Sequence, residues 1–180
     1  MFTKKPLFLI AGHGGADPGA IGSGFKEADL TLELRDLISK ELTDTYTVYN
    51  DVNNHSLSSV ITWIKGLITP SCLLVDIHFN ASFNPGATGV EVLVPDSFST
   101  FEAKLADNIC KVTTAVLGIK NRSVKKESQS ARSKIAILNV PAQNILIEVC
   151  FISNKSDINS YQKNKHKLAK AIAETIKGAY

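Results

Sequence analysis

Three residues of this 180-residue chain have types and positions that suit metal chemistry. His13 follows the apolar run LFLIA, Glu27 opens a helical pattern, and His78 lies near the end of the apolar run CLLVDIHF. Ligands of open α/β sheets bind at the carboxyl ends of the strands, so we expect these side chains to converge there. Two imidazoles and one carboxylate are the ligand set of a catalytic zinc that keeps a fourth position for water.

A fourth residue, Glu148, lies inside the apolar run NILIEVCF. Burying a carboxylate in such a strand costs free energy unless the group is paired or has a chemical task. A water bound to zinc has its pKa lowered toward about 7, and it still needs a base to take its proton. We expect Glu148 to be that base and to have a raised pKa.

Five glycines separate His13 from Glu27, and we expect them to let this loop fold tightly around a metal. Each candidate alone also has an ordinary interpretation. A histidine at a strand end can be a hydrogen-bonded turn residue, and a first-turn glutamate is favoured by the helix dipole. Glu148 can belong to a buried salt bridge. His55 and His166 lie among polar residues and are predicted to be solvated, and Glu91 is predicted to face away from the core.

The elements that must position these residues alternate along the chain. Apolar runs predict strands and i, i+4 patterns predict helices, which together indicate a layered α/β fold in one domain, 1–180. The stretch 120–134 is polar and is predicted to be a surface loop. Predicted strands lie at 7–11, 46–50, 72–79, 88–95, 135–139 and 144–151, and predicted helices at 27–42, 56–68, 97–118 and about 156–178.

The composition excludes several classes of function. A net charge of +3 without an arginine-rich helix argues against a nucleic-acid partner. No segment approaches the ~20 apolar residues of a membrane span, so no membrane insertion is expected. The apolar part of the N-terminus is too short for a signal peptide, which predicts synthesis in the cytoplasm. Cys72, Cys110 and Cys150 are predicted to be buried free thiols, as expected in a reducing compartment.

Four segments in order, GHGGADPGAIGSGFKEADLTLEL, DIHFNAS, ATGVEVLV and ILIEVCFISNKSDINSY, resemble the Amidase_3 family of N-acetylmuramoyl-L-alanine amidases. The resemblance runs from about residue 7 into the C-terminal helix. It implies a mixed, mostly parallel central sheet of about six strands with helices on both faces. It also implies a zinc ion on His13, Glu27 and His78, with Glu148 as the catalytic glutamate.

The implied reaction is hydrolysis of the amide bond between N-acetylmuramic acid and L-alanine in peptidoglycan. Asn80 in HFNAS and Arg122 in KNRSV match family positions near the site, and both are expected to contact substrate, with the orientation of the His78 loop as the alternative role of Asn80. In the second motif Ser123 stands where glycine is common in the family, which weakens the expectation for Arg122.

The resemblance to phage endolysins leads us to expect a lysin that reaches the cell wall after release from the cytoplasm, or by a non-classical export route. We expect no separate wall-binding domain, because one domain fills the chain without a break in composition. We also expect no activator protein, because the interval 92–137 has no long insertion that would carry an inhibitory helix. Two alternatives remain. A zinc peptidase would use the same four residues on peptide bonds of the stem or cross-bridge, and a non-catalytic wall-binding module would keep only the fold.

Overall fold

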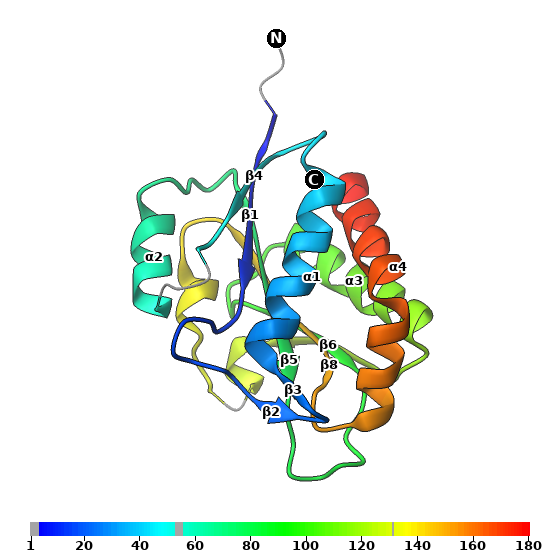
Figure 1. Ribbon diagram of the computed structural model, residues 1–180. Coiled ribbons are helices and arrows are strands. Elements are labelled where there is room, and N and C mark those ends of the chain that lie inside the picture. The colour runs from blue at the N-terminus through cyan, green and yellow to red at the C-terminus, as the bar shows by residue number, and fades with distance from the viewer. Residues whose placement is uncertain (1–3, 53–55, 131) are drawn as a thin grey trace.

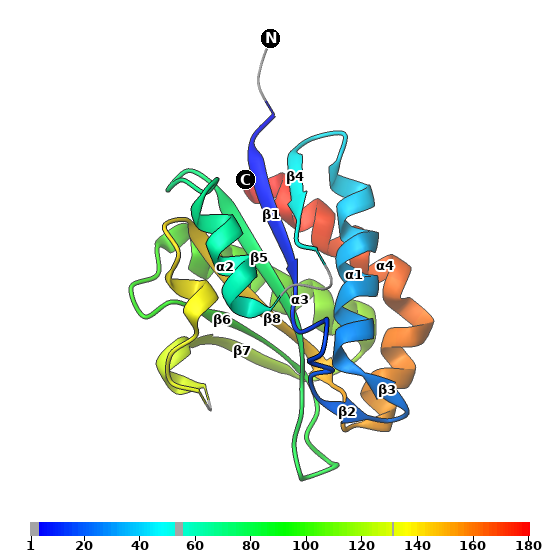
Figure 2. The ribbon, with the colours of Figure 1, turned by 60° about the vertical axis from the view of Figure 1, so that its left-hand side comes forward.

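The computed structural model describes residues 4–52, 56–130 and 132–180, which form an α/β fold. Six strands build one sheet in the order β4-β1-β5-β8-β6-β7 (Figures 1 and 2). The elements are β1 (Pro6–Ala11), β2 (Ile21–Gly22), β3 (Phe25–Lys26), α1 (Glu27–Leu42), β4 (Thr47–Asn50), α2 (Leu57–Lys65), β5 (Leu73–Asn80), β6 (Val90–Val94), α3 (Thr100–Leu117), β7 (Asn121–Lys126), two 3-10 turns, η1 (Glu127–Gln129) and η2 (Ala136–Asn139), then β8 (Gln143–Phe151) and α4 (Lys155–Ala179).

Most of the sheet is parallel. The pairs β4–β1, β1–β5 and β5–β8 are parallel, whereas β6 runs antiparallel to β8 and parallel to the edge strand β7. The mixed, mostly parallel sheet of about six strands is therefore confirmed. Because β1, β5 and β8 run in one direction, their carboxyl ends meet at one edge of the sheet, where a ligand crevice is expected.

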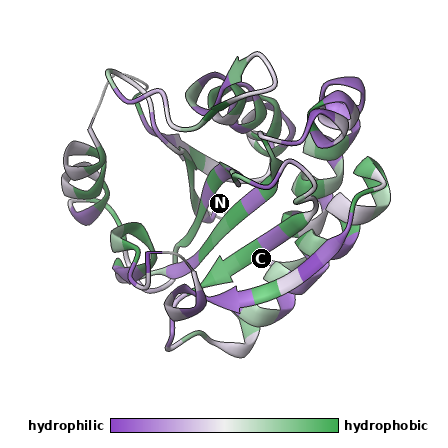
Figure 3. Ribbon diagram, turned by 90° about the horizontal axis from the view of Figure 1, so that it is seen from below, coloured by the Kyte–Doolittle hydropathy of each residue, from purple (hydrophilic) through white to green (hydrophobic). Residues whose placement is uncertain are grey.

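The sequence prediction assigned two neighbouring segments wrongly. The stretch 120–134, predicted to be a loop, contains strand β7, whose side chains are polar except for Val124, as an edge strand allows (Figure 3). The apolar run 135–139, predicted to be a strand, contains the 3-10 turn η2 instead. Its buried residues Ile137 and Leu138 pack against the sheet from outside, and the apolar pattern alone does not distinguish this arrangement from a strand.

The two faces of the sheet are covered unequally (Figure 2). On the first, which we call the covered face, α1, α3 and α4 pack against alternate strand residues such as Leu9, Ile77 and Ile147. On the second, the open face, α2 and η2 cover Phe8 and Leu74. Strand positions farther along the open face are polar. The sheet therefore has one face for its main core and another that also presents charged and polar side chains, among them Asp76, His78 and Glu91.

Several smaller expectations are confirmed within the described residues. Cys72, Cys110 and Cys150 are buried free thiols. His166 is exposed on α4, whereas His55 lies outside the described residues. Gly118 ends α3 in the left-handed conformation, with φ 66°, which glycine adopts without steric cost. In the part of the chain that is described, no helix is both long and apolar enough to cross a bilayer.

Candidate active site

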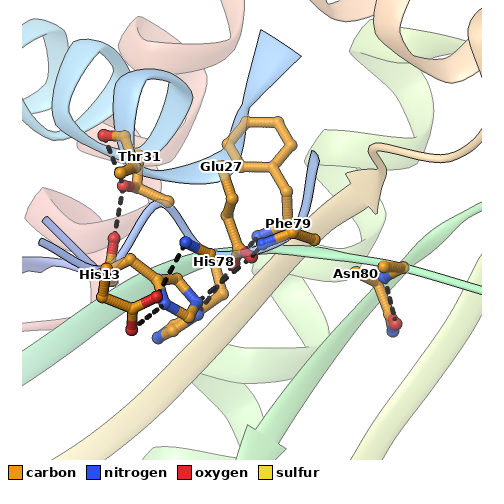
Figure 4. Close-up of polar contacts among 12 residues, drawn as sticks. His13, Glu27, Thr31, His78, Phe79 and Asn80 are labelled. Carbon is orange, nitrogen blue, oxygen red and sulfur yellow. Dashed lines mark hydrogen bonds and ion pairs between the residues drawn. The ribbon is translucent and has the colours of Figure 1, made fainter. Parts of the chain in front are cut away.

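His13, Glu27 and His78 converge at the carboxyl ends of β1 and β5 (Figure 4). Each offers one ligand atom, and these three atoms lie within 4.8 Å of one another. His13 Nε2 is 3.2 Å from Glu27 Oε2, and His78 Nδ1 is 3.0 Å from Glu27 Oε1. The carboxylate thus lies between two imidazoles whose rings are nearly perpendicular, at 78°. Among the described residues this is the one group that has the composition and spacing of a metal site.

Glycines bring the backbone against these side chains, as the glycine-rich sequence predicts. A Cβ atom on Gly12 would lie 2.3 Å from Cε1 of His78. One on Gly19 would lie 2.7 Å from the His13 ring and 2.8 Å from Glu27, and Gly19 also has a positive φ of 64°. A larger residue at either position would displace a candidate ligand. Two of the glycines around His13 are therefore required by the close packing of the site itself.

The loop also fixes Glu27 through its backbone. Glu27 Oε2 accepts a hydrogen bond from the N–H of Ala20 at 2.9 Å, and Oε1 accepts one from the N–H of Phe79 at 3.0 Å. Thr31, one turn further along α1, donates its hydroxyl to the carbonyl of Gly12 at 2.7 Å (Figure 4). These contacts tie the start of α1 to both strands that carry the histidines. Glu27 is consequently held in place without any metal.

Two carboxylates that the sequence analysis did not single out contact the outer nitrogens of the histidines. Asp17 Oδ2 is 2.8 Å from His13 Nδ1, and Asp76 Oδ2 is 3.2 Å from His78 Nε2. A carboxylate on the far nitrogen of a metal-binding histidine fixes the ring orientation and makes the ligand more basic. Asp76 was detectable from sequence, since it lies two residues before His78 and so on the same face of the strand.

The charges in this group are strongly coupled. Burial favours protonation of Glu27, but hydrogen bonds from His13 and His78 outweigh it and hold the Glu27 pKa well below its usual range. The hydrogen bond to Glu27 raises the pKa of His13. Burial opposes protonation of His78, yet Asp76, Glu27 and Glu148 together raise its pKa well above its ordinary value. This is an excess of negative charge around two imidazoles, which suits a bound cation.

Glu148 lies beside this group on the next strand. It pairs in register with His78 on β5 and with Glu91 on β6, so the three side chains form a row across the open face. Its Oε2 atom is buried and has no hydrogen-bond partner among the described residues. Burial raises the pKa of Glu148 to about 7, against the opposing effect of His78. Glu148 therefore has the raised pKa that its sequence context predicts for a base.

Asn80 and Arg122 do not contact the histidine group. Asn80 lies further along β5 (Figure 4) and donates its side-chain amide to Glu91 Oε1 at 3.0 Å. Arg122 and Lys125 both contact the other oxygen of Glu91, at 2.7 and 2.6 Å. Glu91 points away from the main core as predicted, but it is buried beneath these partners. The two residues expected to bind substrate thus share one anchor next to Glu148.

The fold and this site define an α/β protein with a candidate metal site of two histidines and a glutamate beside Glu148. The family model "N-acetylmuramoyl-L-alanine amidase", Amidase_3, matches residues 7–178, and the chain belongs to this family. The resemblance seen in the sequence, and the enzyme class that it implied, are confirmed.

Relatives and solved structures agree with this assignment. The chain is 30% identical to the endolysin of Bacillus phage SPP1, over 96% of this chain and 65% of that protein. It is 29% identical to the amidase LytC of Bacillus subtilis, over 93% of this chain and 34% of LytC, so it spans about a third of that relative. The structure of Cwp6 from Clostridium difficile superimposes with a TM-score of 0.84 at 26% identity, over 98% of this chain and 29% of that one. An amidase from Clostridium difficile 630 superimposes with a TM-score of 0.82 at 23% identity, over 98% and 97% of the two chains, which supports the fold.

Proposed function

We propose that this chain is a zinc-dependent amidase that hydrolyses the bond between the lactyl group of N-acetylmuramic acid and the L-alanine of the stem peptide. The observation that carries the proposal is the position of Glu148, a carboxylate with a raised pKa directly beside a His–Glu–His group. Family membership supplies the bond that is cut. The similarity to two proteins described as an amidase and an endolysin supports the peptidoglycan substrate.

The three candidate ligands fit zinc. Ligand atoms around a tetrahedral zinc lie about 3.4 Å from one another, given metal–ligand distances of about 2.1 Å. The contacts of Glu27 with His13 and His78, at 3.2 and 3.0 Å, are already close to this value. Nitrogen and carboxylate oxygen are ligands that zinc accepts, and the outer nitrogens of both rings face Asp17 and Asp76. His13, Glu27 and His78 would therefore hold the ion.

When bound, zinc would polarise the amide carbonyl and lower the pKa of water. Glu148 would accept the proton from the attacking water and deliver it to the alanine nitrogen as the carbon–nitrogen bond breaks. A base with a pKa near the working pH can both take and return a proton, and a pKa of about 7 meets this requirement. Asn80 and Arg122 would contact the substrate beyond Glu148.

The test is mass spectrometry of the fragments that the purified protein releases from isolated peptidoglycan, with and without a chelator. We expect free stem peptides that begin at L-alanine, and no release after chelation unless zinc is added back. Peptides cut within the stem or cross-bridge would assign the site to a zinc peptidase. A failure to release any fragment from walls of several types would support a wall-binding module instead.

We propose a phage-lysin role for the activity, on the basis of the similarity to the SPP1 endolysin, with access to the wall through a membrane opening. We also propose that no activator is needed. Expression in a susceptible bacterium should cause lysis only when a phage membrane pore is produced as well. Lysis without the pore would argue for an export route, and purified protein that is inactive until a second protein is added would contradict the second proposal.

A further inference from the structure

Arg122 and Lys125 reach the same carboxylate because β7 is irregular. Residues three apart in a regular strand point to opposite faces of a sheet. Here the register with β6 shifts between Val90 and Val92, and Ser123 adopts a positive φ of 71°. Such irregularities redirect side chains and often lie next to active sites. Both cations consequently face Glu91 on the open face, beside Glu148.

The side chain of Arg122 is fixed by two contacts that leave its terminal guanidinium nitrogens available to a ligand. Its Nε donates to Glu91, and its guanidinium plane lies over the ring of Phe151, 4.9 Å from the ring centre. Within the described residues, no partner contacts its two terminal nitrogens, and the side chain is 29% exposed. These nitrogens form the fork that binds a carboxylate through two parallel hydrogen bonds. The anchoring contacts fix the fork before any ligand arrives, which reduces the entropy lost on binding.

The local charge favours an anion. Glu91 accepts hydrogen bonds from Asn80, Arg122 and Lys125, and although burial opposes its ionisation, the two cations hold its pKa below the usual value. One carboxylate against two cations leaves a net charge of +1 on this cluster. Lys125 is 30% exposed, so its ammonium is also accessible. Glu91 therefore acts as a positioning residue for a cationic surface.

The separation between the strand of the candidate ligand His78 and the strand of Glu91 is similar to the length of about two extended peptide residues plus one side group. His78 and Glu91 are separated by two strand spacings, about 9.6 Å. In an extended chain, the second residue after the scissile carbonyl lies about 7 Å from that carbonyl. The α-carboxylate of this residue extends one bond further. If the second residue of the stem peptide is a glutamate that is joined to the third residue through its side-chain carboxyl group, its α-carboxylate stays free. Arg122 reaches from β7 to the side chain of Glu91, so its guanidinium lies on the Glu91 side of Glu148, where a peptide that crosses this row would bring that carboxylate.

We propose that Arg122, supported by Lys125 and positioned by Glu91, binds the free α-carboxylate of the second residue of the stem peptide. This inference rests on the proposed amidase function. It names a substrate class: stems whose second residue is D-glutamate should be cut faster than stems in which the same carboxylate is amidated to D-isoglutamine. The loss of one charged, two-pronged contact corresponds to about a 10- to 100-fold difference in kcat/KM.

The test compares two disaccharide-peptide substrates that differ only in this group, D-glutamate or D-isoglutamine at the second position. We expect the wild-type enzyme to prefer the acid by about 10- to 100-fold. Arg122→Gln should lower kcat/KM for the acid by that factor more than it lowers kcat/KM for the amide, which brings the ratio close to 1. Arg122→Lys keeps the charge without the fork, so it should restore only part of the preference. Arg132→Gln, at an exposed arginine outside the cluster, is the matched control and should keep the full preference.

The outcomes separate the two proposals. Equal cleavage of both substrates by the wild type, or a preference that survives in Arg122→Gln, would overturn the subsite and leave the amidase function intact. Cleavage of neither substrate, with intact peptidoglycan also uncut, would overturn the function and with it the subsite. Equal weakening of acid and amide cleavage in Arg122→Gln would also show that the inference is wrong. If binding to walls then depended on an anionic wall polymer, the cationic cluster would be assigned to that polymer.

Discussion

The two faces of the central sheet differ in the kind of residue that the strands present to them. On the covered face, strand residues meet α1, α3 and α4 in a single apolar cluster that includes Tyr161 and Ile172. On the open face, the row His78, Glu148 and Glu91 crosses three strands with few apolar contacts, and Glu148 Oε2 lacks a partner among the described residues. Because alternate residues of one strand serve both faces, β8 contributes to the core and to the chemistry at once. The difference predicts that substitutions on the two faces will separate stability from activity.

The largest effect on activity is expected from Glu148→Gln on the open face. Removing a positioned general base should lower kcat by about 10²- to 10⁴-fold. Zinc content, measured by elemental analysis, should stay at the wild-type level. The free energy of unfolding should be unchanged or higher, because a buried carboxylate oxygen without a partner is replaced by a neutral group.

His13→Ala is the companion variant for this experiment. It should lose zinc as well as turnover, because it removes one of three candidate ligands. Equal loss of zinc in His13→Ala and Glu148→Gln would mean that Glu148 is itself a ligand.

On the covered face, Ile172→Ala should cost about 2–5 kcal/mol in free energy of unfolding, since Ile172 is fully buried in α4. Urea denaturation followed by circular dichroism measures this cost. The kcat of the folded fraction should match the wild type. A fall in kcat at low temperature, where the variant is fully folded, would show that the two faces are not independent.

A smaller effect is expected from Asp76→Asn, which alters the contact with the outer nitrogen of His78. The affinity for zinc should fall about 10- to 100-fold, as for other residues that orient a metal-binding histidine. Competition with a chromogenic chelator measures this affinity directly. Asp17→Asn, at an exposed carboxylate, is the comparison and should weaken zinc less. Unchanged zinc affinity in Asp76→Asn would remove Asp76 from the site.

The smallest effect is expected at the start of α3. Ser99 accepts the N–H of Glu102 and the Glu102 carboxylate accepts the N–H of Ser99, which is a complete capping box. Ser99→Ala should cost about 1 kcal/mol of stability. Thermal unfolding gives the change in stability, and kcat should be unaffected. A loss of activity would indicate that α3 influences the open face through the sheet.

The sequence was most informative where function forces unusual residues. The histidines at strand ends and the glutamate within NILIEVCF led to residues that the fold does bring together as a candidate site, and residue spacing predicted the helices that support it. It was least informative at the edge of the sheet. β7 is mostly polar and contains the irregularity at Ser123, so its sequence lacks the alternating pattern that predicts a strand. Ile137 in η2 packs on the open face without joining the sheet, so its apolar pattern wrongly predicted a strand.

Contacts between distant residues were also beyond reach of the sequence pattern. Nothing in the spacing of Glu91, Arg122 and Lys125 indicates that they meet, because their contact depends on the register of β6 with β7. Asp76 was predictable in principle, since it alternates with His78, but a buried aspartate in a strand has several ordinary explanations.

The place of β8 in the sheet has a consequence for how the protein matures. The three candidate ligands lie within the first 78 residues, whereas Glu148 arrives on the last strand to be synthesised, and that strand is inserted between β5 and β6. A nascent chain emerges from the ribosome starting at its N-terminus. Such a chain can bring its three candidate ligands together early and still lack Glu148, the proposed base, until β8 pairs in the sheet. On the proposed mechanism, activity therefore begins only after β8 has been made and has paired in the sheet.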